Sequence, residues 1–161
     1  MLRWVGLVAR LVVGGVWLWA GFLKVAEPES SVSAVRGYQL LAPSVADAVG
    51  RALPMTEVVL GACLVVGLLT RFAGGLSALL QLAFIIGIAS VWARGISINC
   101  GCFGDGGPNP DAIGHYPWEI ARDVGLLALS LFLVWLPRTP LALDNLLYSV
   151  SPGGRDVEEA T

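Results

Sequence analysis

Four long apolar stretches constrain this chain more than any other feature of its sequence. They lie at residues 5–23, 54–69, 72–92 and 118–136. Each reaches or approaches the roughly 20 residues that an α-helix needs to cross about 30 Å of hydrocarbon. The chain is 56% hydrophobic and 14% charged, with a mean hydropathy of +0.75, which is too apolar for a soluble domain of 161 residues. We therefore expect an all-α membrane protein, a bundle of four transmembrane helices.

The links between these stretches contain prolines and polar residues that place the helix ends. Pro28 should end the first helix, and residues 29–42 predict a short amphipathic helix at the membrane interface between helices one and two. A second short helical stretch, 45–53, precedes Pro54, which we expect to open the next long helix because a missing N–H is harmless there. Only Thr70 and Arg71 separate the second and third helices, so these should be antiparallel neighbours. Residues 1–140 then form the transmembrane domain, and 141–161 an interfacial turn and a disordered tail.

The charged residues bear on targeting and partners. Arg3 and Arg10 near the first apolar stretch would suit a signal peptide, but no small-x-small cleavage site follows, so we expect the stretch to be retained. The net charge is −2 and no Lys/Arg cluster exists, so nucleic acid is not an expected partner. The Arg and Lys counts barely decide orientation. We expect a multi-pass protein of the bacterial plasma membrane with its amino terminus inside and the loop at 94–117 outside, on the oxidising side.

That loop contains Cys100-Gly101-Cys102. Its many glycines and prolines predict an ordered loop rather than a strand or helix. Two cysteines separated by one residue meet the distance limit for a disulfide only if the backbone turns, which Gly101 permits. The closed ring would be strained, and a strained disulfide is easily reduced. The pair therefore favours thiol–disulfide exchange, with Cys100 and Cys102 as the reacting residues.

Other interpretations of the cysteines stay open. A structural bridge would join distant segments, and Cys63 lies in an apolar run, where a thiol is a small hydrophobe. A metal site would need about four ligands. The loop offers Cys100, Cys102 and His115, with Asp105 or Asp111 nearby, and the absence of a second Cys/His pair speaks against it. The loop thiols could also be inert.

Five other polar residues are candidates to support the pair. His115, the single histidine, could act as a base that lowers the pKa of a nearby thiol, or it could be a solvated loop residue. Ionisable residues at membrane depth are costly, so those at helix ends on the side of the cysteine loop need a reason. These residues are Lys24, Glu57, Arg122 and Asp123. They could form a polar cap that holds the loop or binds the head of a quinone, or their side chains could simply reach the lipid head groups.

Several of these segments together resemble the MauE/DoxX-like redox-associated membrane proteins. The likeness covers most of residues 5–136, and its most specific part is Cys100-Gly101-Cys102-Phe103-Gly104. It extends to Trp19-Ala20-Gly21-Phe22-Leu23-Lys24, Pro28, Pro54-Met55-Thr56-Glu57, Gly61, Gly67, Arg71 and Arg122-Asp123. The resemblance implies a helical membrane bundle that helps oxidise or mature extracytoplasmic proteins, as in methylamine utilisation, beside a thioredoxin-like partner. It also makes a quinone a candidate cofactor.

Three functions are compatible with these observations. The first is a component of a thiol–disulfide oxidoreductase. The second is a non-catalytic scaffold or assembly factor for a redox enzyme, with incidental thiols. The third is a membrane protein that binds a soft metal through its thiolates.

Overall fold

The computed structural model describes residues 2–135, and most of them are helical. Five α-helices lie in this part of the chain: α1 (Leu2–Ala26), α2 (Pro28–Gly37), α3 (Pro43–Val66), α4 (Thr70–Ala93) and α5 (Tyr116–Trp135). Between α4 and α5 come the strands β1 (Ile98–Cys100) and β2 (Gly106–Pro108) and the 3-10 turn η1 (Ala112–Gly114). The turn and tail predicted for 141–161 lie outside the described residues.

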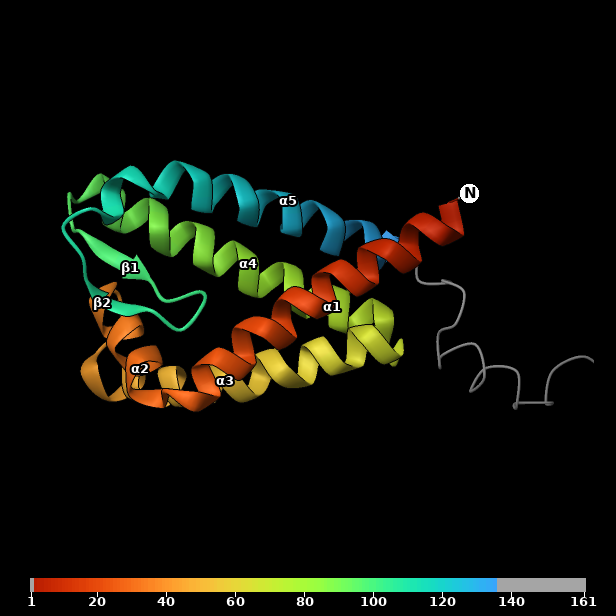
Figure 1. Cartoon of the computed structure of the whole chain (residues 1–161), viewed down its shortest axis with the longest axis horizontal. Helices are drawn as coiled ribbons and strands as arrows, with labels where there is room; N and C mark the ends of the chain where they lie inside the picture. Colours follow the sequence, from red (N-terminus) through yellow and green to blue (C-terminus); the bar gives the residue numbers. More distant parts are fainter. Residues whose placement is uncertain (1, 136–161) are drawn as a thin grey trace, which may run out of the picture.

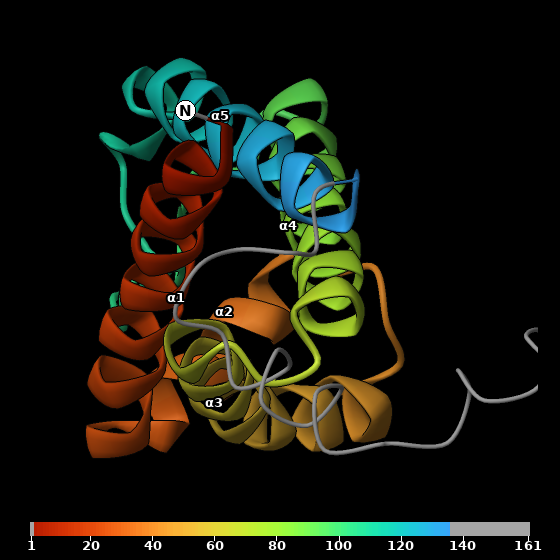
Figure 2. The ribbon, with the colours of Figure 1, turned by 90° about the vertical axis from the view of Figure 1, so that its right-hand side faces the viewer.

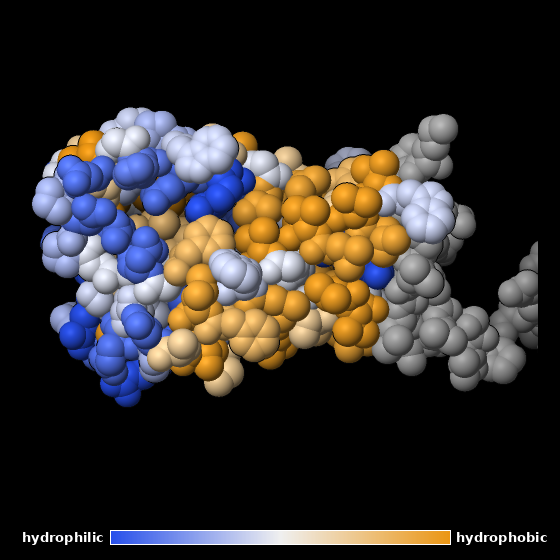
Figure 3. Space-filling view, in the orientation of Figure 1, coloured by the Kyte–Doolittle hydropathy of each residue, from blue (hydrophilic) through white to orange (hydrophobic). Residues whose placement is uncertain are grey.

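Three of the helices are long and apolar enough to cross a membrane, over Trp4–Ala26, Pro43–Val66 and Thr70–Ala93. Their outer faces carry large exposed apolar side chains, among them Trp19 at 65% and Phe72 at 70%. Figure 3 shows apolar side chains over the helices and a hydrophilic end at α2 and the hairpin. An apolar surface of this extent fits a membrane protein. The fourth predicted span corresponds to α5, and its crossing stays a prediction.

The long helices pack chiefly as two pairs, α1 on α3 and α4 on α5 (Figures 1 and 2). The first pair is close because glycines face each other. A Cβ added to Gly61 would lie 2.7 Å from the Leu18 nitrogen and 2.8 Å from the Gly14 carbonyl oxygen. A shared apolar core joins the two pairs, and its fully buried members include Val13, Leu64 and Leu133.

The prediction that the second long helix opens at Pro54 is wrong. Helix α3 starts at Pro43 and continues through Pro54. A proline inside a helix lacks the N–H that would bond the carbonyl four residues earlier, here that of Gly50. The Ser31 hydroxyl of α2 donates a hydrogen bond to the Gly50 oxygen at 2.8 Å. A side chain from another helix thus replaces the missing bond, and the stretches 45–53 and 54–69 belong to one helix that ends at Val66.

The other helix ends differ from the predictions by a few residues. Gly67 adopts φ +76° after α3, and its amide and that of Leu68 both donate to the Cys63 carbonyl at 2.9 Å. This left-handed cap ends the helix early. The link to α4 is therefore 67–69 rather than Thr70 and Arg71, although the two helices are antiparallel neighbours as expected (Figure 1). α5 starts at Tyr116 rather than at 118.

The loop at 94–117 was expected to contain no strand or helix, which is wrong. β1 and β2 form an antiparallel hairpin that pairs Ile98 with Pro108, and Cys100 with Gly106. α2, which ends at Gly37 rather than at 42, lies between α3 and this hairpin. The contact is close, because a Cβ on Gly106 would lie 2.1 Å from the Ser30 carbonyl oxygen. Strands of three residues carry too little sequence pattern to be predicted, and α2 supports them.

Candidate functional site

The two loop cysteines lie together at the hairpin. Cys100 ends β1, Cys102 follows in the tip, and Gly101 between them turns the backbone with φ +69°. The Cys102 amide contacts the Cys100 sulfur at 3.4 Å. Both cysteines are free thiols in this structure and are 6% and 7% exposed. A side-chain hydrogen bond between the two thiols, followed by burial, raises the pKa of the Cys102 thiol well above its usual value.

Three hydroxyl side chains hold the hairpin over the helices. The Ser30 hydroxyl donates to the Gly104 carbonyl at 2.5 Å and accepts from the Gly106 amide at 2.8 Å. Tyr38, which directly follows α2, donates to the Cys100 carbonyl at 2.8 Å. Burial raises the pKa of the Tyr38 hydroxyl well above its ordinary value, which keeps it a donor.

Tyr116 anchors the hairpin from the opposite side. Its hydroxyl accepts from the Ile98 amide at 3.0 Å and lies 2.8 Å from the Ile98 carbonyl oxygen. The sequence alone does not identify Ser30, Tyr38 or Tyr116 as part of this arrangement. A serine or tyrosine near a helix end carries no distinctive pattern, so its contact with a hairpin far away in the sequence was not predictable.

Four of the expected polar residues form two ion pairs beneath the hairpin tip. Lys24 of α1 bonds Glu57 of α3 at 2.5 Å, with side chains 1% and 0% exposed. The alternative that Lys24 extends to the head groups is wrong, because its side chain is buried. Arg122 bonds the neighbouring Asp123 of α5 at 2.9 Å and stacks over the Phe103 ring at 4.7 Å.

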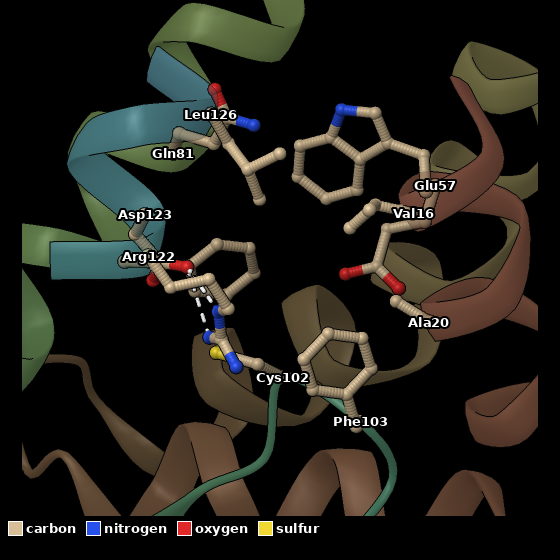
Figure 4. Close-up of a pocket in the computed structure, with 11 residues that line it drawn as sticks. Val16, Ala20, Glu57, Gln81, Cys102, Phe103, Arg122, Asp123 and Leu126 are labelled. Carbon is tan, nitrogen blue, oxygen red and sulfur yellow. Dashed lines mark hydrogen bonds and ion pairs between the residues drawn. The ribbon is translucent and has the colours of Figure 1, made fainter. Parts of the chain in front are cut away.

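A small cavity lies between these ion pairs and the thiols. Cys102 and Phe103 line it from the hairpin tip, and the carboxylates of Glu57 and Asp123 line it from two helices (Figure 4). Its volume is about 30 Å³, which is room for about two water molecules. The remaining walls are mostly apolar and come from α1, α4 and α5; they are Val16, Trp17, Ala20, Gln81, Phe84, Arg122 and Leu126. The cavity thus brings together residues from four helices and the hairpin.

His115 is not part of this arrangement. It is exposed and follows η1, and within the described chain its imidazole has no side-chain hydrogen bond or ion pair. Asp105 and Asp111 are exposed as well. Among the described residues, no three His, Cys, Asp or Glu side chains come together as a metal site would require. The loop residues that the sequence offered as metal ligands therefore do not converge.

Cys63 lies away from the hairpin, inside α3. Its side chain is partly buried and packs against the apolar cluster that contains Leu64 and Val13. This environment agrees with its interpretation as a small hydrophobic residue.

Comparison with known proteins gives one result. Residues 2–136 match the family of methylamine utilisation protein MauE. No curated protein matches the chain, and no solved structure does. The family match spans the helices, the hairpin and both cysteines, whereas the wider likeness to DoxX-like proteins stays a prediction. The match covers most of the 161 residues, so this chain belongs to the MauE family of methylamine utilisation proteins.

Proposed function

We propose that this protein is a membrane thiol–disulfide redox protein that supports the oxidation or maturation of extracytoplasmic proteins. The observation that carries the proposal is the juxtaposition of two free thiols across a turned glycine, beside a cavity lined by two carboxylates. A purely structural role would require neither a second thiol nor ionised groups next to the first. The MauE family match supports methylamine utilisation as the process that this chemistry would serve.

The proposed reaction is disulfide exchange with a thioredoxin-like protein. One thiolate of the Cys100–Cys102 pair attacks the partner's disulfide, and a mixed disulfide forms as one partner thiolate leaves. The second thiol of the pair, once deprotonated, attacks the mixed disulfide and releases the other partner thiolate. The pair is then a disulfide, the partner is a dithiol, and two electrons and two protons have moved to the partner. The reverse sequence oxidises the partner.

Burial of the thiols sets a condition on this exchange. Both side chains are less than 8% exposed, so a partner's sulfur reaches them only when the hairpin tip moves. The tip is held to α2 through the Ser30 hydroxyl, which makes two of its hydrogen bonds. We propose that docking of the partner at the hydrophilic end of the molecule displaces these contacts (Figure 3).

The proposed arrangement in the membrane has four spans, with α5 as the fourth. The chain would lie in the bacterial plasma membrane with the hairpin and α2 outside. Two features support this: the hydrophilic end contains the hairpin, and the turn at 67–69 lies at the opposite end of the helices (Figures 1 and 3).

A quinone is the lipid-soluble electron acceptor that fits this scheme. Cys102 faces the cavity, whose walls are largely apolar. At about 30 Å³ the cavity admits water but not a quinone ring, so quinone binding would require α1 and α5 to separate. Addition of a water-soluble quinone to reduced protein in detergent tests this, because oxidation of the pair at a rate that saturates with quinone concentration indicates a bound complex.

A trapping experiment tests the central proposal. Cys100→Ser or Cys102→Ser leaves one thiol that cannot resolve a mixed disulfide, so one of the two variants should accumulate a covalent complex on non-reducing gels. Cys63→Ser is the matched control and should trap nothing. If neither loop variant yields a reducible complex in cells grown on methylamine, thiol exchange is not the function.

The burial of both thiols also favours a second candidate, a scaffold for a redox enzyme. Buried thiols contribute to packing, and Cys100 and Cys102 belong to an apolar cluster with Tyr38, Ile88 and Tyr116. The Cys100→Ala/Cys102→Ala variant separates the two functions. A scaffold retains methylamine-dependent growth with this variant, whereas a redox protein loses it.

A further inference from the structure

Two buried carboxylates at the cavity each have one oxygen atom without a hydrogen-bond donor among the described residues. Lys24 bonds Oε1 of Glu57, and Arg122 bonds Oδ1 of Asp123. The second oxygen of each carboxylate, Oε2 of Glu57 and Oδ2 of Asp123, has no hydrogen-bond donor among the described residues. Glu57 is 0% and Asp123 4% exposed. A buried carboxylate oxygen without a donor is strongly unfavourable, so these atoms point to a guest that donates hydrogen bonds.

The charges around the cavity restrict what that guest is. The two cations and two anions cancel, so neither a further anion nor a further cation is favoured there. The volume of about 30 Å³ corresponds to about two water molecules. Water donates two hydrogen bonds and accepts others, which suits two carboxylate oxygens and the thiol of Cys102 on the same cavity.

A third carboxylate lies one helical turn before Asp123 on α5. Residues four apart share one helix face, so Glu119 and Asp123 both project from α5 toward the hairpin. Glu119 is half-buried, its side chain interacts with Cys100, and its Oε2 has no partner in the described chain. Each thiol of the pair therefore has a carboxylate of α5 beside it.

We propose that α5 supplies the proton acceptors of the thiol pair, with Asp123 serving Cys102 through water in the cavity and Glu119 serving Cys100. The inference rests on the proposed thiol exchange and deepens it. A disulfide forms only after both thiols lose their protons, and the burial of Cys102 beside Cys100 favours its protonated form. A base at each thiol removes this obstacle.

The proton and electron balance is as follows. The Cys102 S–H gives its proton to cavity water, which passes one of its own to Oδ2 of Asp123, and the resulting thiolate attacks a disulfide of the oxidant. Cys100 gives its proton to Glu119 and attacks the mixed disulfide. The pair loses two electrons to the oxidant, and the carboxylic acids return two protons to the leaving thiolates.

Other ionisable groups also face the pair and would influence its pH dependence. Lys24 of α1 favours the Cys102 thiolate, and Asp123 opposes it. The further groups are Tyr38 near α2, Glu57 of α3, Glu119 and Arg122 of α5 and Cys100 of β1.

The test measures oxidation of the reduced, purified protein by the small neutral disulfide 2-hydroxyethyl disulfide, as a function of pH. Asp123→Asn should lower the rate at neutral pH at least tenfold, as loss of a general base does, and Glu119→Gln should lower it as well. Asp123→Glu should restore most of the rate. Asp111→Asn, an exposed acid of the same loop, is the control and should match the unaltered protein. An unchanged rate and pH profile in Asp123→Asn would overturn the inference.

Asp123→Asn leaves the Arg122 charge unpaired, so a second design guards against misfolding. The Arg122→Gln/Asp123→Asn protein keeps the cavity neutral and should remain slow, whereas Arg122→Gln alone keeps the base and should react faster than the double variant. Time-resolved infrared difference spectra of oxidation with labelled aspartate should show a transient carboxyl signal that Asp123→Asn removes. If the pair cannot be oxidised in the unaltered protein, the proposed function fails; if it is oxidised at equal rates with and without Asp123, only this inference fails.

Discussion

At the scale of single residues, the buried Lys24–Glu57 pair should have the largest effect on the free energy of unfolding. Removing one partner of a buried ion pair leaves an uncompensated charge and costs about 3–5 kcal/mol. We expect Lys24→Met to lower the unfolding free energy in detergent by about that amount. Lys24→Met/Glu57→Leu should recover most of the loss, because no charge is left unpaired. The half-exposed Arg36–Asp47 pair is the control, and Arg36→Met should lower stability much less, because solvent screens that pair. Equal losses for both pairs would contradict this.

The Cys102 thiol should make the stability of the protein depend on pH. Its pKa is raised by the hydrogen bond with Cys100 and by burial, so the folded protein holds this proton more tightly than the unfolded chain does. Stability from this group is complete below the unfolded thiol's pKa of about 8.5 and is lost as pH rises through the folded value. Iodoacetamide should therefore modify Cys102 with a midpoint at higher pH in folded than in denatured protein, which mass spectrometry of the alkylated peptide measures. Coinciding midpoints would be evidence against a buried thiol.

At the scale of elements, α3 depends on a hydroxyl from α2. Ser31 bonds the Gly50 carbonyl, which Pro54 leaves without its helical donor. We expect Ser31→Ala to lower the unfolding free energy by about 1–3 kcal/mol, the cost of an unsatisfied buried carbonyl. In a Pro54→Ala background the restored amide would bond Gly50, so the same change should cost clearly less. Ser44→Ala, at an exposed position, is the control. Equal costs in both backgrounds would show that the Ser31 bond does not replace the missing one.

The hairpin is the second element whose position depends on close contact with α2. A Cβ at Gly106 would lie 2.1 Å from the Ser30 carbonyl oxygen, whereas a Cβ at Gly114 meets nothing within 4 Å. Gly106→Ala should therefore lift the hairpin from α2 and expose the thiols, and Gly114→Ala should not. The expected result is alkylation of Cys100 and Cys102 at least tenfold faster in the first variant, measured at one pH in folded protein. Unchanged alkylation would mean that α2 does not hold the hairpin.

At the scale of the whole molecule, the two ends of the bundle should lie on opposite sides of the membrane. Asp111 is exposed near the hairpin, and Arg71 is exposed at the start of α4, near the opposite turn. In a protein lacking its native cysteines, an impermeant maleimide should label Asp111→Cys in intact cells and Arg71→Cys only after permeabilisation. Labelling of both in intact cells would exclude the proposed arrangement, and the reverse pattern would invert it.

The sequence by itself determined the class of protein and the position of its closely spaced cysteine pair. The hydrophobicity of a helix is a property of one local stretch, so the three apolar helices could be predicted, although the second begins at Pro43 rather than at 54. The Cys100–Gly101–Cys102 spacing is local too, and Gly101 does take the positive φ that the turn requires.

Only the tertiary structure decided how the polar residues pair and what surrounds the thiols. Lys24 and Glu57 are 33 residues apart, and Ser31 and Gly50 are 19 apart, so no local pattern shows that they meet. The same holds for the hairpin, whose three-residue strands depend on α2, and for His115, which the fold leaves exposed. The physical reason is that burial and hydrogen bonding at this site depend on contacts between elements distant in the chain. The length of an apolar stretch, by contrast, is a property of each helix alone.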